Sequence, residues 1–331
     1  MKLATFNLEN LDLVTRKGVT FGERINALRP ILVELGADIL CVQEVNGQKV
    51  RGEPRRELRA LELLLEGTPY ASWDRCSTLS PTGRGVVEAH NLVIVSRYPI
   101  AAARELMHKH VPPIGYTPVT ARPLPTEPQY IRFDRPVLCA ELTLPSGERL
   151  TVFNAHLRAA LASPVTGQKR SAKVWNSLGG WAEGLFVSAI KRAAQALDLR
   201  LEVDSILGMD PDALIAIAGD MNSETVEMPS RILMGASEET GNLMLQKNSL
   251  ICLEEGIPTD RRYTVLYNGR RQMLDHIFVS DALGKRALNL KILNAELVDE
   301  SSPGTAVKYF SGSFHAPLIA EFSEVQAKGN V

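Results

Sequence analysis

The chain has 331 residues, of which 45% are hydrophobic and 23% are charged. This is ordinary globular composition, with enough apolar material for a large core. A formal net charge of −1 argues against a protein that coats nucleic acid along its whole surface, although a local basic groove remains compatible with it. At roughly 150 residues per domain, length alone favours two domains.

The cysteines and the N-terminal segment bear on the cellular compartment. No two cysteines form a C-x-x-C pair, and Cys41 and Cys139 lie inside apolar runs, so we expect reduced core residues rather than a disulfide framework. The first residues enter a strand pattern without the apolar region of a secretory signal. No apolar stretch approaches the ~20 residues of a membrane span. We therefore expect a cytoplasmic protein without a membrane span. The sequence does not determine the oligomeric state, and a monomer is our working expectation.

Short apolar runs alternate along the chain with stretches of helical periodicity. In the first helical stretch, Gly36 is positioned as a C-terminal cap, and Pro30 either kinks the helix or starts its main body. Asn268-Gly269 is the tight turn of a late hairpin. The patterns predict strands at 2–8, 38–45, 91–100, 212–223 and 315–322, helices at 23–38, 57–67 and 185–201, and hairpins at 141–157 and 263–280.

Hairpins are mixed with helical crossovers, and strands from both ends of the chain contribute. No Gly/Ser linker divides the sequence. We therefore expect an α/β fold of mixed, mostly antiparallel sheets with helices outside. Two segments are expected to be long loops: 112–128, which contains six prolines, and 158–184, where cations stand near Trp175 and Trp181.

Nearly every predicted core strand ends in polar residues that a strand end does not require. Strand ends that face one way would gather these groups into one polar pocket on a rigid scaffold. Each residue alone has an ordinary structural explanation, such as a turn or a cap, but their recurrence at successive strand ends favours a site. The residues are Asn7, Glu9, Gln43, Glu44, Asn154, His156, Asp220, Asn222, Asp275, His276 and His315.

The residue types in this set are chemically specific. Carboxylate and amide oxygens are hard ligands suited to Mg²⁺ or Mn²⁺, and the sequence has no Cys/His tetrad for zinc. Histidines beside carboxylates suit proton transfer and the binding of an anionic oxygen. Neither a Gly-rich phosphate loop nor a G-x-S-x-G turn is present. The combination indicates metal-assisted hydrolysis of a phosphate ester.

Seven segments resemble, in the same order, motifs of the endonuclease/exonuclease/phosphatase superfamily. They are TFNLEN, CVQEV, NLVIVSRYPI, NAHL, GDMNS, LDHIFVS and SFHAP, and they extend over nearly the whole chain. The resemblance implies a four-layer α/β sandwich of the DNase-I type, in which helices flank two central, mostly antiparallel mixed sheets. It also implies one domain over 1–325, followed by a tail at 326–331, in place of the two domains that length favours.

The resemblance assigns roles to several of the strand-end residues. It implies that Glu44 is a direct ligand of Mg²⁺ or Mn²⁺ and that Asn7 serves the metal. Asp220 and Asn222 would position the attacking water and the scissile phosphate, and His156 would contact the phosphate.

Asp275 would hydrogen-bond to His315 and hold its tautomer, so that an imidazolium is stabilised as charge builds on the phosphate. Either His315 or Asp220 would take the proton of the water. Three further residues are expected to bind the substrate: Asn154, Asn91 and Arg158.

One position departs from the family pattern. The family usually carries Ser-Asp-His at the last motif, whereas this chain has Ser313-Phe314-His315. Phenylalanine cannot bind a metal, so one carboxylate is missing. Either Asp220 or water completes the coordination, or the chain is a catalytically silent binding module.

Three functions follow. We favour a nuclease acting on DNA or RNA, because nuclease-like proteins form a broad part of this family. A phosphomonoesterase or phospholipase-type hydrolase of inositol phosphates or lipid head groups is the second, and the silent module is the third. Basic residues near aromatics suit single-stranded nucleic acid, but solvated helix faces and core tryptophans explain them equally well. The basic residues are Arg51, Arg55, Arg56, Arg59, Lys169, Arg170 and Lys173.

Overall fold

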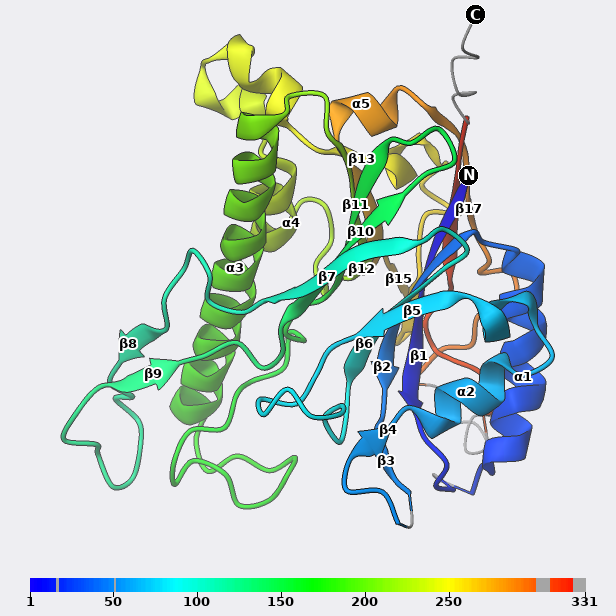
Figure 1. The fold of residues 1–331 in the computed structure, drawn as a ribbon. Coiled ribbons are helices and arrows are strands. Elements are labelled where there is room, and N and C mark those ends of the chain that lie inside the picture. Colours follow the sequence, from blue (N-terminus) through cyan, green and yellow to red (C-terminus); the bar gives the residue numbers. More distant parts are fainter. Residues whose placement is uncertain (16–17, 51, 302–309, 324–331) are drawn as a thin grey trace, which may run out of the picture.

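Two six-stranded sheets lie face to face in the computed structural model, which describes residues 1–15, 18–50, 52–301 and 310–323 (Figure 1). In spatial order, the first sheet contains β17 (Ala287–Ile292), β18 (Leu318–Phe322), β1 (Lys2–Leu11), β2 (Ile39–Val45), β6 (Asn91–Ser96) and β5 (Asp74–Ser77). The second contains β13 (Ile251–Cys252), β16 (Asp275–Val279), β12 (Leu214–Asp220), β11 (Arg149–His156), β10 (Val137–Thr143) and β7 (Ile100–Leu106).

Each sheet contains one parallel pair among antiparallel neighbours. The parallel pairs are β1 with β2 and β11 with β12, and the other adjacent strands run antiparallel. Strands from the two ends of the chain, β1 and β18, pair directly. The predicted mixed, mostly antiparallel sheets are therefore confirmed. The predicted tail at 326–331 lies outside the described residues.

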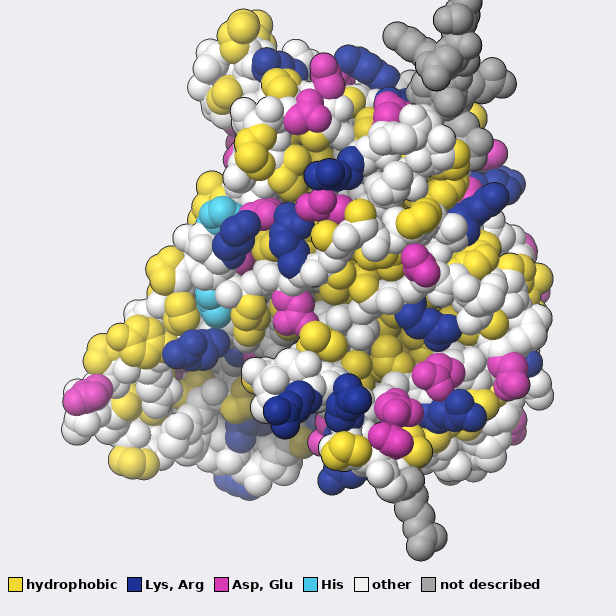
Figure 2. Space-filling view, in the orientation of Figure 1, with side chains coloured by type: hydrophobic (Ala, Val, Ile, Leu, Met, Phe, Trp, Pro, Cys, Tyr) yellow, Lys and Arg dark blue, Asp and Glu magenta, His cyan; other side chains and the backbone are white. Residues whose placement is uncertain are grey.

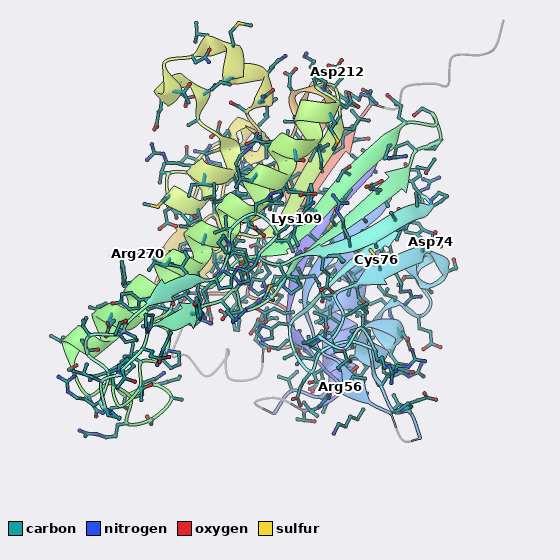
Figure 3. The ribbon with its side chains drawn as sticks, turned by 60° about the vertical axis from the view of Figure 1, so that its left-hand side comes forward. Arg56, Asp74, Cys76, Lys109, Asp212 and Arg270 are labelled. Atoms are coloured by element: carbon teal, nitrogen blue, oxygen red, sulfur yellow. The ribbon has the colours of Figure 1, made fainter. Side chains whose placement is uncertain are left out.

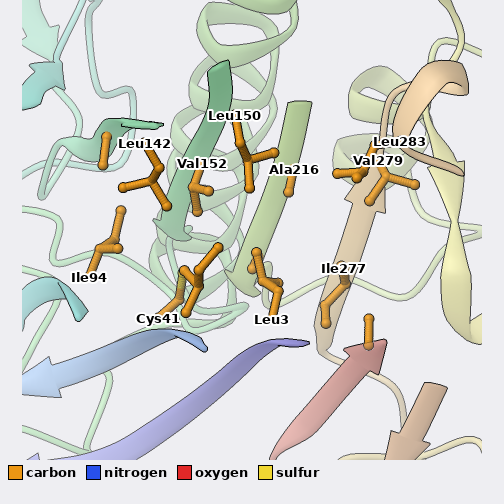
Figure 4. Close-up of a cluster of buried hydrophobic side chains, with 14 of the residues drawn as sticks. Leu3, Cys41, Ile94, Leu142, Leu150, Val152, Ala216, Ile277, Val279 and Leu283 are labelled. Carbon is orange, nitrogen blue, oxygen red and sulfur yellow. The ribbon is translucent and has the colours of Figure 1, made fainter. Parts of the chain in front are cut away.

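Helices cover both outer faces, which completes the four predicted layers (Figure 1). On the first sheet lie α1 (Phe21–Leu35) and α2 (Arg59–Leu65), and on the second lie α3 (Leu178–Met209) and α4 (Met228–Met234). Three apolar clusters fill the three interfaces. In the middle cluster, Leu3, Cys41 and Ile94 of the first sheet face Val152 and Ala216 of the second (Figure 4).

Local signals set the helix ends. Thr20 and Glu23 form a capping box at the start of α1, and Gly36 ends it in the left-handed conformation, as predicted. Pro30 lies inside this helix. Helix α3 extends beyond the predicted 185–201 at both ends, so residues 178–184 of the expected 158–184 loop are helical. Ser177 caps the start of the helix through a 2.9 Å bond from the backbone nitrogen of Gly180. Its first turns were not recognised because their large apolar side chains point to solvent.

Two predicted segments differ in detail from the structure. The proline-rich segment 112–128 is not all loop, because β8 (Ile114–Tyr116) pairs with β9 (Gln129–Ile131). The late hairpin turns at Asn268-Gly269 as expected, with both residues at positive φ. It forms a separate ribbon of β14 (Val265–Tyr267) and β15 (Arg270–Gln272), whereas the following strand joins the second sheet. The remaining short elements are β3 (Gln48–Lys49), β4 (Arg56–Glu57), α5 (Asp281–Gly284) and the 3₁₀ turns at Pro69–Ser72, Ser237–Thr240, Leu243–Asn248 and Leu253–Gly256.

The cysteines agree with the expectation of reduced thiols. All four lie within the described residues and are free, and three of them are buried. None of the helices in the described part of the chain is both long and apolar enough to cross a bilayer.

Candidate active site

The carboxyl ends of the two parallel strand pairs meet at one edge of the sandwich. Asn7 and Glu44 come from β1 and β2, whereas His156 and Asp220 are register neighbours at the ends of β11 and β12. Asn7 Nδ2 lies 3.1 Å from Asp220 Oδ2 and 3.3 Å from Glu44 Oε1. A single buried amide thus joins carboxylates from both sheets, and these four predicted strand-end residues lie together.

A second pair of groups faces this cluster. His315 Nδ1 lies 2.8 Å from Asp275 Oδ2, which is the hydrogen bond expected from the sequence. Asp275 is the register partner of Asp220, and His315 Nε2 lies 4.0 Å from Asp220 Oδ2. Because Nδ1–H donates to Asp275, the other ring nitrogen of His315 faces the carboxylate cluster.

His156 is held from its other side by an arginine. Its Nε2 lies 3.4 Å from Asp220 Oδ2 and 3.9 Å from Glu44 Oε1. Arg135 Nη1 contacts Nδ1 of the same ring. Since a guanidinium only donates, Nδ1 accepts and the proton of the neutral ring lies on Nε2. Burial, followed by the charge of Arg135, holds the pKa of His156 well below its usual value, so the ring is neutral.

The loop after β12 is fixed by its own backbone. The backbone nitrogen of Asn222 donates to Asp220 Oδ1 at 2.8 Å, and its side-chain Nδ2 donates to the Leu157 carbonyl at 3.1 Å. Arg192 donates to the Asn222 carbonyl at 2.7 Å. Asn222 therefore orients Asp220 and connects the ends of β11 and β12.

Backbone strain is concentrated at this edge. Seven non-glycine residues within the described ranges have positive φ, and five of them surround the site. Such conformations cost of order 1–3 kcal/mol each and persist where the surroundings enforce them, often at functional sites. The five are Glu9, Asn10, Glu44, His90 and Asn222.

The carboxylates and His315 alter one another's proton affinity. Burial and the neighbouring Asp275 raise the pKa of Asp220 to about 7. Burial opposes a charge on His315, but the carboxylates of Asp275, Asp220 and Glu44 outweigh it and raise the pKa of the imidazole to about 10. At neutral pH the site therefore holds an imidazolium beside a carboxyl group that is poised to exchange a proton.

Two residues predicted to bind substrate hold the scaffold together instead. Asn154 is fully buried, and its Nδ2 donates to the carbonyls of Val42 and Val93 at 3.0 and 2.9 Å. Its Oδ1 accepts from Gln43 Nε2 at 2.7 Å. Asn154 therefore connects the two sheets and has no exposed atom for a ligand.

Asn91 is equally buried, and its side chain is bonded to nearby backbone groups. Its Nδ2 donates to the carbonyls of Val45 and Val87 at 2.9 Å each, and its Oδ1 accepts from the Val87 nitrogen at 3.0 Å. The third predicted substrate residue, Arg158, does lie beside the site. Its Nη1 is 3.2 Å from Asp134 Oδ2, and Asp134 immediately precedes Arg135.

Three further residues border the site without having been assigned a role from the sequence. Arg135 lies in an irregular segment before β10, and His90 stacks on His156 with a centroid distance of 6.1 Å. Glu9 Oε2 accepts from the backbone nitrogen of Phe314 at 3.0 Å. Only Glu9 carried a signal, as a polar residue near the end of the first strand.

The Phe314 side chain belongs to the packing at this edge. It is 8% exposed, and its ring lies 4.8 Å from that of Phe310. The carboxylate of Glu9 lies beside the backbone of this position and interacts electrostatically with Glu44 and His315. A carboxylate is therefore present beside position 314, although the residue at that position cannot supply one.

The donor set fits a hard divalent cation. Asp220 and Asp275 lie opposite each other in buried positions, an arrangement of like charges that a cation relieves. Within the described part of the chain, Asp275 Oδ1 is buried and has no hydrogen-bond partner. Asn7, Glu9 and Glu44 add further oxygen ligands of the type that Mg²⁺ and Mn²⁺ prefer.

The basic run at 51–59 contributes to the local surface. Arg56 donates to the Gly47 carbonyl at 2.8 Å and pairs with Glu88 at 2.9 Å, and Arg59 pairs with Glu62 at 3.0 Å. Arg51 lies outside the described residues. These local contacts favour the explanation of a solvated surface over that of a nucleic-acid contact.

Comparisons with known proteins identify the family of the chain. The family model described as "Endonuclease/Exonuclease/phosphatase family" matches residues 4–291. A search of curated protein sequences finds no significant match.

Three solved structures illustrate the shared fold. An endonuclease/exonuclease/phosphatase family protein from Leptotrichia buccalis is 16% identical, with 98% of this chain and 100% of that chain covered and a TM-score of 0.53. TDP2 of D. rerio, complexed with single-strand DNA product, is 14% identical, with 98% and 99% covered and a TM-score of 0.55. An AP endonuclease from Archaeoglobus fulgidus is 14% identical, with 98% and 100% covered and a TM-score of 0.52. The chain belongs to the endonuclease/exonuclease/phosphatase family of metal-dependent phosphoester hydrolases.

Proposed function

We propose that this chain is a divalent-metal-dependent phosphodiesterase that acts on nucleic acid. The observation that carries the proposal is the convergence of the Asp275–His315 pair on Asp220, which is itself bonded to Asn7 beside Glu44. This arrangement places a charged imidazole, a proton-accepting carboxyl group and oxygen ligands within one small site.

The residues that would hold the metal are Glu44 and Asn7, with Glu9 as the carboxylate beside position 314. When bound, Mg²⁺ or Mn²⁺ polarises a phosphoryl oxygen and stabilises the charge that develops on it.

Side chains of the protein carry out the proton transfers and orient the phosphate. His315, protonated at Nε2, donates to a phosphate oxygen, and Asp275 keeps it oriented and charged. Asp220 accepts the proton of the attacking water, because burial and the neighbouring Asp275 raise its pKa to about 7, close to neutral pH. Neutral His156 presents Nε2–H at the same edge, and Arg135 fixes its tautomer.

Two observations support nucleic acid as the substrate class. D. rerio TDP2 is solved with single-strand DNA product, and the Neisseria 3' phosphatase NExo is solved with a product DNA hairpin. In this chain, Arg135 and Arg158 place two guanidinium groups beside the site, where backbone phosphates would lie. The four free cysteines support a reducing compartment such as the cytoplasm.

The test is a hydrolysis panel of single- and double-stranded DNA, RNA, inositol phosphates and bis-p-nitrophenyl phosphate. Each substrate is measured with Mg²⁺, with Mn²⁺ and with EDTA, beside an Asp220→Asn control purified in the same way. Metal-dependent cleavage of nucleic acid that the control lacks would support the proposal. Cleavage of inositol phosphates alone would support the phosphomonoesterase alternative. No hydrolysis of any substrate, together with no metal binding in calorimetry, would support the binding module.

A further inference from the structure

A projecting part of the molecule stands beside the active site. It consists of residues 107–135, residues 158–177 and the first half of α3, residues 178–191, and we call it the lobe. In Figure 1 it lies at the lower left, where β8 and β9 stand against the lower half of α3. Figure 2 shows groups of hydrophobic side chains among polar ones on its outer surface.

The lobe contains a hollow between its hairpin and α3. The hollow has a volume of about 290 Å³, which is near the lower end of the range for ligand pockets. Its walls come from β8, β9, the 163–165 segment and α3. The lining residues that matter here are Tyr116, Tyr130, Arg132, Phe133, Asp134 and Lys191.

We propose that this hollow holds an unpaired base of a single-stranded nucleic acid whose scissile phosphate lies at the Asp220–His315 site. The inference rests on the proposed function and adds a substrate class to it, namely single strands rather than duplexes. A base that is stacked inside a duplex cannot enter such a hollow, whereas an unpaired base can.

The side chains of the hollow suit a base and its phosphates. Tyr130 of β9 is 66% exposed, and Arg132, which directly follows the strand, is also exposed; both line the hollow. Phe133 and Tyr116 line the hollow beside them. Aromatic rings stack on any base, and an arginine beside them contacts the backbone phosphates.

The lobe is a fixed structure. Glu183 on α3 is buried and accepts hydrogen bonds from Tyr116 Oη at 2.7 Å, from the Val119 nitrogen at 2.6 Å and from the Thr120 nitrogen at 2.9 Å. A Cβ added at Gly184 would lie 2.3 Å from the Ser163 carbonyl, so the helix packs closely against the second segment of the lobe. These contacts hold the hollow open before a ligand arrives, which lowers the entropic cost of binding.

The first segment of the lobe is fixed in the same way. His108 stacks on Phe133 with a centroid distance of 3.7 Å and accepts from its backbone nitrogen at 3.0 Å. Lys109, labelled in Figure 3, pairs with α3: its Nζ is 2.6 Å from Glu202 Oε2. The wall that carries Tyr130 and Arg132 is therefore anchored just after Arg132.

Asp134 links the wall of the hollow to residues beside the active site. Asp134 lines the hollow, and its two oxygens lie 2.6 Å from Lys191 Nζ and 3.2 Å from Arg158 Nη1. The next residue, Arg135, contacts His156. The cations Arg132, Lys191, Arg158 and Arg135 thus extend from the hollow to the site, a course that suits the sugar-phosphate backbone of one strand.

A membrane surface fits these features less well. The outer surface of the lobe exposes apolar side chains such as Leu178, at 86%, and Leu161, at 70%. The hollow itself is concave, and its lining includes the cations Arg132 and Lys191 beside three aromatic rings as well as aliphatic residues, a combination that suits a flat ring next to a phosphate better than a bundle of acyl chains. Lipid binding is therefore the alternative that the experiment below must exclude.

The experiment measures binding in EDTA, so that it does not depend on hydrolysis. Fluorescence anisotropy follows labelled oligothymidylate of about ten nucleotides, a duplex of the same length, and vesicles of phosphatidylcholine with phosphatidylserine. The full chain is compared with Tyr130→Ala and with Tyr130→Phe, which keeps the ring. The control is Arg149→Ala, an exposed cation at the opposite end of the strand that terminates at His156.

The wild-type chain should bind the single strand more tightly than the duplex. Tyr130→Ala should weaken that affinity about tenfold, whereas Tyr130→Phe and Arg149→Ala should stay within about twofold, because stacking requires only the ring. Equal affinity for the single strand and the duplex, or equal affinity of the two Tyr130 variants, would overturn the inference even if hydrolysis of DNA is observed.

Two further outcomes separate the inference from the proposed function. Binding that depends on the Tyr130 ring, in a chain that hydrolyses no substrate, would support the hollow and refute the phosphodiesterase. Binding of vesicles but not of the oligonucleotide, with release by Tyr130→Ala, would assign the lobe to a lipid surface and refute the inference.

Discussion

Two neighbouring residues of β16 each form an acid–histidine pair, and the two pairs differ in their access to solvent. Asp275 pairs with His315 at 2.8 Å, and the histidine side chain is 17% exposed to solvent. His276 pairs with Glu254, and both of those side chains are fully buried. Because consecutive residues of a strand point to opposite faces, the two pairs lie on opposite sides of the second sheet.

The second nitrogen of each ring explains the difference in role. His315 Nε2 faces Asp220 across the open site, whereas His276 Nε2 donates to the Ser223 carbonyl at 2.8 Å. The Glu254–His276 pair therefore ties β16 to the loop that follows Asp220 and has no atom left for a substrate. A carboxylate–imidazole pair can therefore act on a ligand or stabilise the scaffold. The role depends on whether Nε2 of the histidine faces the open site or a backbone carbonyl.

The largest effect in this comparison should come from Asp275→Asn. Asparagine cannot stabilise an imidazolium at His315, and hydrolysis at pH 7 should fall by about 10²–10⁴-fold. Initial rates with Mn²⁺ would measure the loss, and circular dichroism should show an unchanged fold. A variant with the wild-type rate would remove this pair from the mechanism.

His276→Ala should act on stability instead. It leaves Glu254 buried without its partner, a change that costs about 3–5 kcal/mol of the free energy of unfolding. Urea titration would measure this loss. The double variant Glu254→Leu/His276→Leu removes both charges and should recover much of it. A loss below about 1 kcal/mol in the single variant would contradict the assignment of a buried ion pair.

The pH dependence of stability should distinguish a charged His315 from a neutral one. Its folded-state pKa is raised to about 10, above the unfolded value of about 6.5. The stabilisation from its charge is therefore complete below about pH 6.5 and is lost as pH rises through about 10. In EDTA, the stability difference between the wild type and His315→Gln should shrink over that interval, and a constant difference would indicate a neutral ring.

The smallest effect should come from Phe314→Asp. A carboxylate at this position adds an oxygen ligand beside Glu9, so Mn²⁺ binding measured by calorimetry should tighten. The variant also loses the contact with Phe310, and Phe314→Leu is the matched control for that packing. An unchanged Mn²⁺ titration would show that position 314 lies outside the metal site.

The strands, and the strand ends that carry the site, could be predicted because their signals are local. Alternation marks each strand, and a polar residue at its end marks the edge, so Asn7, Glu44, His156 and Asp220 were found. The sequence carries no comparable signal for how deeply a residue lies between the two sheets. Asn154 shares a strand face with His156 but lies one step further inside, where the carbonyls of the other sheet occupy its amide.

Irregular segments were beyond this kind of prediction. Arg135 reaches His156 from a stretch without periodicity, and only the folded chain brings the two together. The start of α3 was missed because Leu178 and Trp181 are exposed, whereas sequence periodicity marks the buried face of a helix.

The most direct test of the account is the rate at which the wild-type chain and His315→Ala hydrolyse a single-stranded oligonucleotide in Mn²⁺. The account predicts a wild-type rate that EDTA abolishes, and a rate at least about a hundredfold lower in His315→Ala at an unchanged fold. Equal rates in the two proteins, both insensitive to EDTA, would contradict the assignment of this edge of the sandwich as the active site.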